Sequence, residues 1–172
     1  MHAINVKNKA AARYALSVAN NKTAGYLELS YELSWDAVLF CAYHARIIPH
    51  SKIRQADSRR LVRMDDQKIL SRSAMLATEE GHMIGFFDEG RLVHVMVATG
   101  NGRAAGSKND RIGINGAGGW EVVDLAKDLV WEQHGVRKIR SEAPTADGKG
   151  LLLIRSRPIS ELWSGTFPGS EQ

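Results

Sequence analysis

Residues 81–110 read GHMIGFFDEGRLVHVMVATGNGRAAGSKND, and this stretch decides the fold that the sequence predicts. Its first apolar run ends in Phe-Phe before an Asp-Glu-Gly turn at 88–90. Its second run is rich in β-branched residues and ends before a Gly-Asn-Gly turn at 100–102. Glycine and asparagine suit the positive φ angles of tight hairpin turns. We therefore expect a β-meander whose third strand begins near residue 103.

The segments on either side of the meander predict helices before it and further strands after it. Residues 3–20 are rich in Ala, and residues 34–47 carry apolar side chains at helical spacing until a proline ends the helix. Residues 136–141 and 151–155 are short apolar runs that predict two more strands. We expect an α+β fold in which N-terminal helices pack on an antiparallel sheet, with residues 1–172 forming a single domain.

Three other segments complete the prediction. Residues 26–33 alternate only in part, so a helix and a strand both remain open. Residues 120–133 carry an apolar stripe at helical spacing and predict the best helix of the chain. Residues 46–72 hold eight Lys and Arg against three Asp, which favours a solvated helix or loop pair over the core.

Composition narrows the class of protein. The chain has 172 residues, 44% of them hydrophobic and 24% charged, as is usual for a globular domain. A net charge of +4 is too small to indicate nucleic-acid binding by itself. No apolar run approaches the ~20 residues that cross a bilayer, and the N-terminus lacks the apolar region of a signal peptide. We expect no membrane partner, and a protein that is cytoplasmic or exported without a cleavable signal peptide.

His94 and Cys41 are the candidate reactive residues. His94 stands among apolar neighbours on the second meander strand, where an ionisable ring is unfavourable unless it is paired or used. Cys41 is the only cysteine and lies on the expected helix 34–47. His82 begins the first meander strand and is expected at the surface or rim. The six histidines show no metal-ligand spacing, and neither glycine-rich segment has the context of a nucleotide site, so we expect no metal and no cofactor.

The order of features in residues 81–110 resembles the NlpC-type amidases of the papain-like cysteine hydrolases. The shared features are the strand ending in Phe-Phe, the acidic-Gly turn, His-Val on the next strand and the Gly-Asn-Gly turn. In that family the catalytic His opens the strand before such a hairpin, and the nucleophilic Cys lies upstream at a helix N-terminus. The resemblance covers about 30 of the 172 residues.

The resemblance implies a papain-like fold and a triad of catalytic residues. Cys41 would be the nucleophile, and His94 the general base and then the general acid. Asn109 would orient the imidazole, with Asp110 as the alternative. The implied function is hydrolysis of an amide bond in a peptide, in peptidoglycan or in a protein side chain. It could belong to a peptidase, an amidase or the toxin-type deamidase of a bacterial effector.

Two alternatives from other classes stay open. In the first, the chain is a non-catalytic protein-binding domain on the same fold, and Cys41 is a small buried apolar residue. In the second, basic side chains bind nucleic acid electrostatically; few aromatic residues lie among them to stack on bases, which makes a nucleic-acid partner the weaker choice. These side chains are Arg54, Arg59, Arg60 and Arg63.

Overall fold

The computed structural model describes residues 2–21, 24–53, 67–116, 118–138 and 150–163. Its helices are α1 (His2–Asn21), α2 (Ala24–Tyr31), α3 (Ser34–His44), α4 (Arg72–Ala77) and α5 (Leu125–Asp128). Its strands are β1 (Gln67–Ile69), β2 (His82–Asp88), β3 (Arg91–Gly100), β4 (Arg103–Gly106), β5 (Glu121–Asp124), β6 (Trp131–Glu132), β7 (Gly135–Arg137) and β8 (Leu151–Pro158). Short 3₁₀ turns include η3 (Asn109–Ile112) and η4 (Ile159–Trp163).

The predicted meander is confirmed as the centre of one curled antiparallel sheet. β2, β3 and β4 are consecutive neighbours in the order β5-β4-β3-β2-β8-β7-β6. β1 pairs with β8 along the edge opposite to β2. Both hairpin turns have two successive residues at positive φ, Glu89 (48°) with Gly90 (81°) and Asn101 (56°) with Gly102 (78°). Paired positive φ angles are typical of the tight turns whose twist matches that of antiparallel strands.

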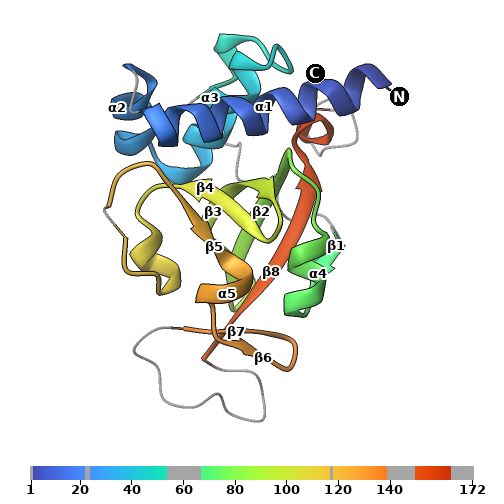
Figure 1. The fold of residues 1–172 in the computed structure, drawn as a ribbon, viewed down its shortest axis with the longest axis vertical. Helices are drawn as coiled ribbons and strands as arrows, with labels where there is room; N and C mark the ends of the chain where they lie inside the picture. The colour runs from blue at the N-terminus through green and yellow to red at the C-terminus, as the bar shows by residue number, and fades with distance from the viewer. Residues whose placement is uncertain (1, 22–23, 54–66, 117, 139–149, 164–172) are drawn as a thin grey trace.

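The expected α+β arrangement is confirmed at this level. Helices α1 and α3 both pack on β3, and Figure 1 shows the three N-terminal helices gathered on one side of the sheet, away from α4 and α5. The strands predicted at 136–141 and 151–155 correspond to β7 and β8, which pair with each other; residues 139–141 lie outside the described residues. The segment 26–33, which the sequence left open, forms α2 and the turn before α3.

The helix predicted at 120–133 is wrong. The segment forms β5, the one-turn helix α5 and β6 instead. β5 forms backbone hydrogen bonds with β4. Its β-branched residues Val122 and Val123 then pack in the apolar clusters on opposite faces of the sheet. Asp124 then accepts a hydrogen bond from the Lys127 amide and starts a new helix at Leu125, which ends the strand.

Side chains of the sheet divide between two apolar clusters. On β3, Val95 and Val97 pack with α1 and α3 in the first cluster, while Met96 and Ala98 belong to the second, with residues of α4 and α5. Because strand side chains alternate between the two faces, these clusters cover opposite faces of the sheet. None of the described helices is both long and apolar enough to span a membrane. The four arginines of the nucleic-acid alternative lie outside the described residues.

Candidate functional site

His94 and Asn109 form a hydrogen-bonded pair on the face of the sheet that carries Met96. The Nε2 atom of His94 lies 2.9 Å from Oδ1 of Asn109. The Asn109 amide nitrogen donates to the carbonyl of Gly106 (3.0 Å) and to Oε1 of Glu121 (3.3 Å). Two acceptors thus hold the amide nitrogen, and the amide oxygen faces the ring. An amide oxygen only accepts hydrogen bonds, so Nε2 carries the ring proton and Nδ1 carries the lone pair.

Local backbone geometry aims both members of the pair. Phe86 pairs with His94, but Phe87 pairs with Leu92, so Val93 is an extra residue in a β-bulge directly before His94. Bulges redirect side chains and are frequent beside functional sites. Asn109 begins η3, which is bounded by Lys108 (φ 55°) and Gly113 (φ 92°) in the left-handed region. With these two residues at its ends, η3 follows β4 and contacts β3.

The second ring nitrogen of His94 is buried without a hydrogen-bond partner among the described residues. The ring is 1% exposed and packs against Phe86, with 5.9 Å between ring centroids. Burial lowers the pKa of His94 to about 4, and the hydrogen bond to Asn109 opposes this shift only in part. The imidazole is therefore neutral at physiological pH, with a fixed tautomer and an unused lone pair at Nδ1.

Cys41 lies elsewhere. Residues 35–42 of α3 are all buried, so the helix is surrounded by apolar groups and the thiol is 0% exposed. Burial, with a smaller contribution from the carboxylate of Glu28, raises the pKa of Cys41. The thiol belongs to the cluster of Val95 and Val97, whereas His94 shares the face of Met96. The structure thus joins His94 to Asn109 and leaves Cys41 on the other face of the sheet.

Two acidic residues, Asp110 and Glu121, lie beside the His94–Asn109 pair. Asp110 follows Asn109 in η3 with an exposed side chain, and Asn109 is the residue that accepts the hydrogen bond from the His94 ring. Glu121 was not expected at the site, because the sequence placed it in the first turn of a helix. It reaches Asn109 because β5 pairs with β4 and sets Glu121 opposite Gly106. No spacing in the sequence indicated that pairing.

No group of three or more His, Cys, Asp or Glu side chains that could hold a metal ion occurs in the described part of the chain. Comparisons with protein-family models, with curated proteins and with solved structures gave no match.

The burial of Cys41 predicts an unreactive thiol. The thiolate displaces iodide from iodoacetamide, and a buried thiol with a raised pKa forms little thiolate near neutral pH. We expect negligible labelling of the native protein at pH 7.5 and complete labelling in denaturant, measured by intact mass. Cys41→Ala gives the background. Fast native labelling would contradict this placement of the thiol.

Because His94 is neutral in the folded protein, we expect the protein to lose stability as the pH is lowered. Its folded pKa of about 4 lies below the ordinary value of 6.5, so within this window the unfolded chain binds a proton that the folded protein excludes. The free energy of unfolding should therefore decrease as pH falls from 6.5 to 4, by about 3 kcal/mol from this residue. Urea unfolding at pH 7 and pH 4.5 measures the change. His94→Gln should flatten it, and an equal slope in both proteins would refute the assignment.

Proposed function

We propose that the protein hydrolyses an amide bond, with His94 as the group that accepts and returns the proton. The observation that carries this proposal is the 2.9 Å contact of Nε2 with Asn109, combined with a buried Nδ1 that no described group satisfies. Buried polar atoms are nearly always paired, so an unpaired lone pair in a fixed direction invites a functional explanation.

The chemistry follows from the tautomer. With Nε2 protonated and held by Asn109, Nδ1 can take a proton from an attacking group and then give it to the departing amine. Asn109 keeps the ring from rotating and stabilises the imidazolium that forms between the two steps. Glu121 and the Gly106 carbonyl act one step further away, by holding the amide of Asn109 in place.

The nucleophile on this proposal is a water molecule or a hydroxyl that reaches the Nδ1 side of the ring. Cys41 does not serve from its present position, because it is fully buried on the other face of the sheet. Access to Nδ1 also requires movement of the groups packed on a ring that is 1% exposed. Substrate binding would have to drive that movement, as in enzymes whose sites close over the substrate.

The choice of an amide bond rests on the resemblance of residues 81–110 to NlpC-type amidases. A peptide, peptidoglycan or a protein side-chain amide each remains a candidate substrate. His94 and Asn109 follow the hairpin order of that family, whereas Cys41 of α3 lies on the other face of the sheet from His94 and departs from the Cys–His pair that the resemblance implies.

The second candidate is a non-catalytic protein-binding domain. It is favoured by the burial of both reactive groups, since Cys41 and His94 are 0% and 1% exposed. In that case the His94–Asn109 pair orders the loop after β4 and performs no proton transfer.

One assay separates the two candidates. The wild type and His94→Gln are incubated with peptides, peptidoglycan fragments and glutamine-containing proteins, and released amine or ammonia is measured. Release by the wild type and none by His94→Gln supports hydrolysis at this site. No release from any substrate class, together with an unreactive Cys41, favours the binding domain.

A further inference from the structure

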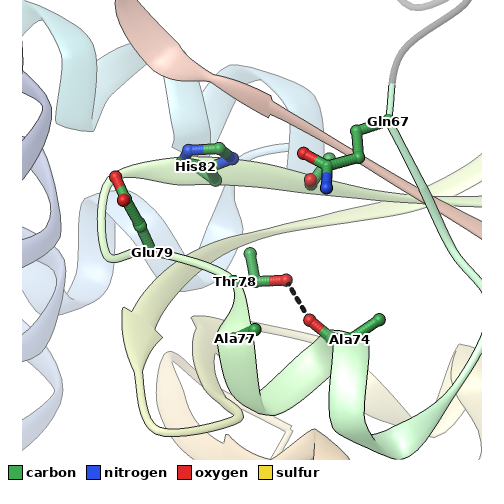
Figure 2. A pocket seen from close by; sticks show the side chains of 7 residues that line it. Gln67, Ala74, Ala77, Thr78, Glu79 and His82 are labelled. Carbon is green, nitrogen blue, oxygen red and sulfur yellow. Dashed lines mark hydrogen bonds between the residues drawn. The ribbon is translucent and has the colours of Figure 1, made fainter.

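A second polar site lies at the end of β2 away from His94. A pocket of about 330 Å³ opens between α4, β1, β2 and β8, in the size range of small-molecule sites. Figure 2 shows its side chains coming from β1, from β2 and from the segment that follows α4. The polar residues that line it are Gln67, Thr78, Glu79, His82 and Ser156.

The pocket occupies a place where the sheet would be expected to stay apolar. Ile84 on β2 and Ile154 on β8 belong to the second apolar cluster. Two residues further along the same face, the side chains become His82 and Ser156. Ser156 is 3% exposed, and Nδ1 of His82 is buried without a hydrogen-bond partner among the described residues. Polar groups at core-facing positions are unfavourable unless something satisfies them.

The hydrogen-bonding character of the pocket favours a donor. Thr78 donates its hydroxyl proton to the Ala74 carbonyl at 2.9 Å, as Figure 2 shows, so its remaining capacity is to accept. Glu79 offers a carboxylate, and burial lowers the pKa of His82, which leaves one ring nitrogen as an acceptor at neutral pH. Gln67 and Ser156 can also accept hydrogen bonds. The lining thus presents several acceptors around one small volume.

The charge of the pocket favours a cation. Among the described residues that line it, Glu79 is the only charged one. Glu161 also acts on His82 with negative charge, although Arg157 lies 3.6 Å from its carboxylate. An anion such as phosphate would meet a carboxylate and no lining cation, whereas an ammonium group supplies three donors and the complementary charge.

We propose that this pocket binds the ammonium group of a small primary amine. The ammonium hydrogen-bonds to Glu79 and Thr78 beside the His82 ring, and the alanines of α4 contact the rest of the ligand. The site is separate from the His94–Asn109 pair, because His94 pairs with Phe86, four residues along β2 from His82. Its existence does not depend on the proposed hydrolysis.

The experiment is an NMR titration that follows the ring protons of His82. Glycinamide supplies a primary ammonium group without a carboxylate, and N-acetylglycinamide is the same molecule with that group capped. We expect saturable shifts with glycinamide and none with the capped compound. Glu79→Gln should weaken binding by about tenfold, as expected for loss of one charge-assisted contact.

The matched control is Glu89→Gln. Glu89 is an exposed carboxylate in the turn at the other end of β2, so this variant removes the same charge without touching the pocket. Glycinamide binding should be unchanged in it. The proposal is overturned if glycinamide gives no saturable shift, if the capped compound binds equally well, or if both variants weaken binding to the same extent.

Discussion

His94→Gln is expected to lower kcat/KM for amide hydrolysis by roughly 10²–10⁴-fold, the usual contribution of a general acid–base group. Glutamine fills much of the space of the ring and can still hydrogen-bond to Asn109, but its amide cannot accept and return a proton at neutral pH. The loss should therefore appear without unfolding. Circular dichroism and urea unfolding at pH 7 check that the variant remains folded.

The activities of Asn109→Ala and Cys41→Ala test whether the loss in His94→Gln is specific to the proposed proton-transfer residue. Asn109 touches the ring and not the substrate, so its removal should cost less, about tenfold to a hundredfold, with the tautomer no longer fixed. Cys41→Ala should retain most of the activity, because the thiol is on the other face of the sheet. If Cys41→Ala instead loses all activity while His94→Gln keeps it, the assignment of the site to His94 is refuted.

The fold was predictable where short-range chemistry determines it. The two hairpins follow from Glu89-Gly90 and Asn101-Gly102, which adopt positive φ in the structure and fix the register of β2, β3 and β4. Residues 120–133 were not predictable in this way. Their helical spacing of apolar residues is real, but pairing of β5 with β4 and the Asp124 cap outweigh it. The pairing of β5 with β4 depends on a tertiary neighbour that a single-sequence pattern does not contain, and the Asp124 cap is a local contact that sets where the short helix begins.

The sequence predicts the His94–Asn109 part of the site but not the position of Cys41. His94 and Asn109 are 15 positions apart with one hairpin between them, so the hairpin itself brings them together. Cys41 is 53 positions before His94, and nothing in that spacing tells which face of the sheet α3 covers. The alternation Val95-Met96-Val97-Ala98 is apolar on both faces, so the sequence could not show that His94 and Cys41 lie on opposite faces of the sheet.

We expect the largest effect on stability from a substitution at Gly81, where α1 contacts the sheet. Gly81 has φ of 88°, and a Cβ there would overlap the backbone carbonyl of Asn8 in α1. The same glycine accepts a hydrogen bond from the amide of Ile159 and donates one to the carbonyl of Ala98. Asn8 in turn exchanges two hydrogen bonds with Ser160. A shift of α1 to admit a methyl group would therefore disturb β3 and η4 as well.

We expect Gly81→Ala to lower the free energy of unfolding by about 3 kcal/mol or more, through the positive φ and the overlap together. Gly90→Ala is the matched control, because Gly90 has φ of 81° and nothing lies within 4 Å of a Cβ placed there. That variant should cost only the conformational part, about 1 kcal/mol. Urea unfolding of the two variants at pH 7 measures the difference. Equal losses would mean that α1 does not lie against Gly81, and the packing of the N-terminal helix on the sheet would then have to be redrawn.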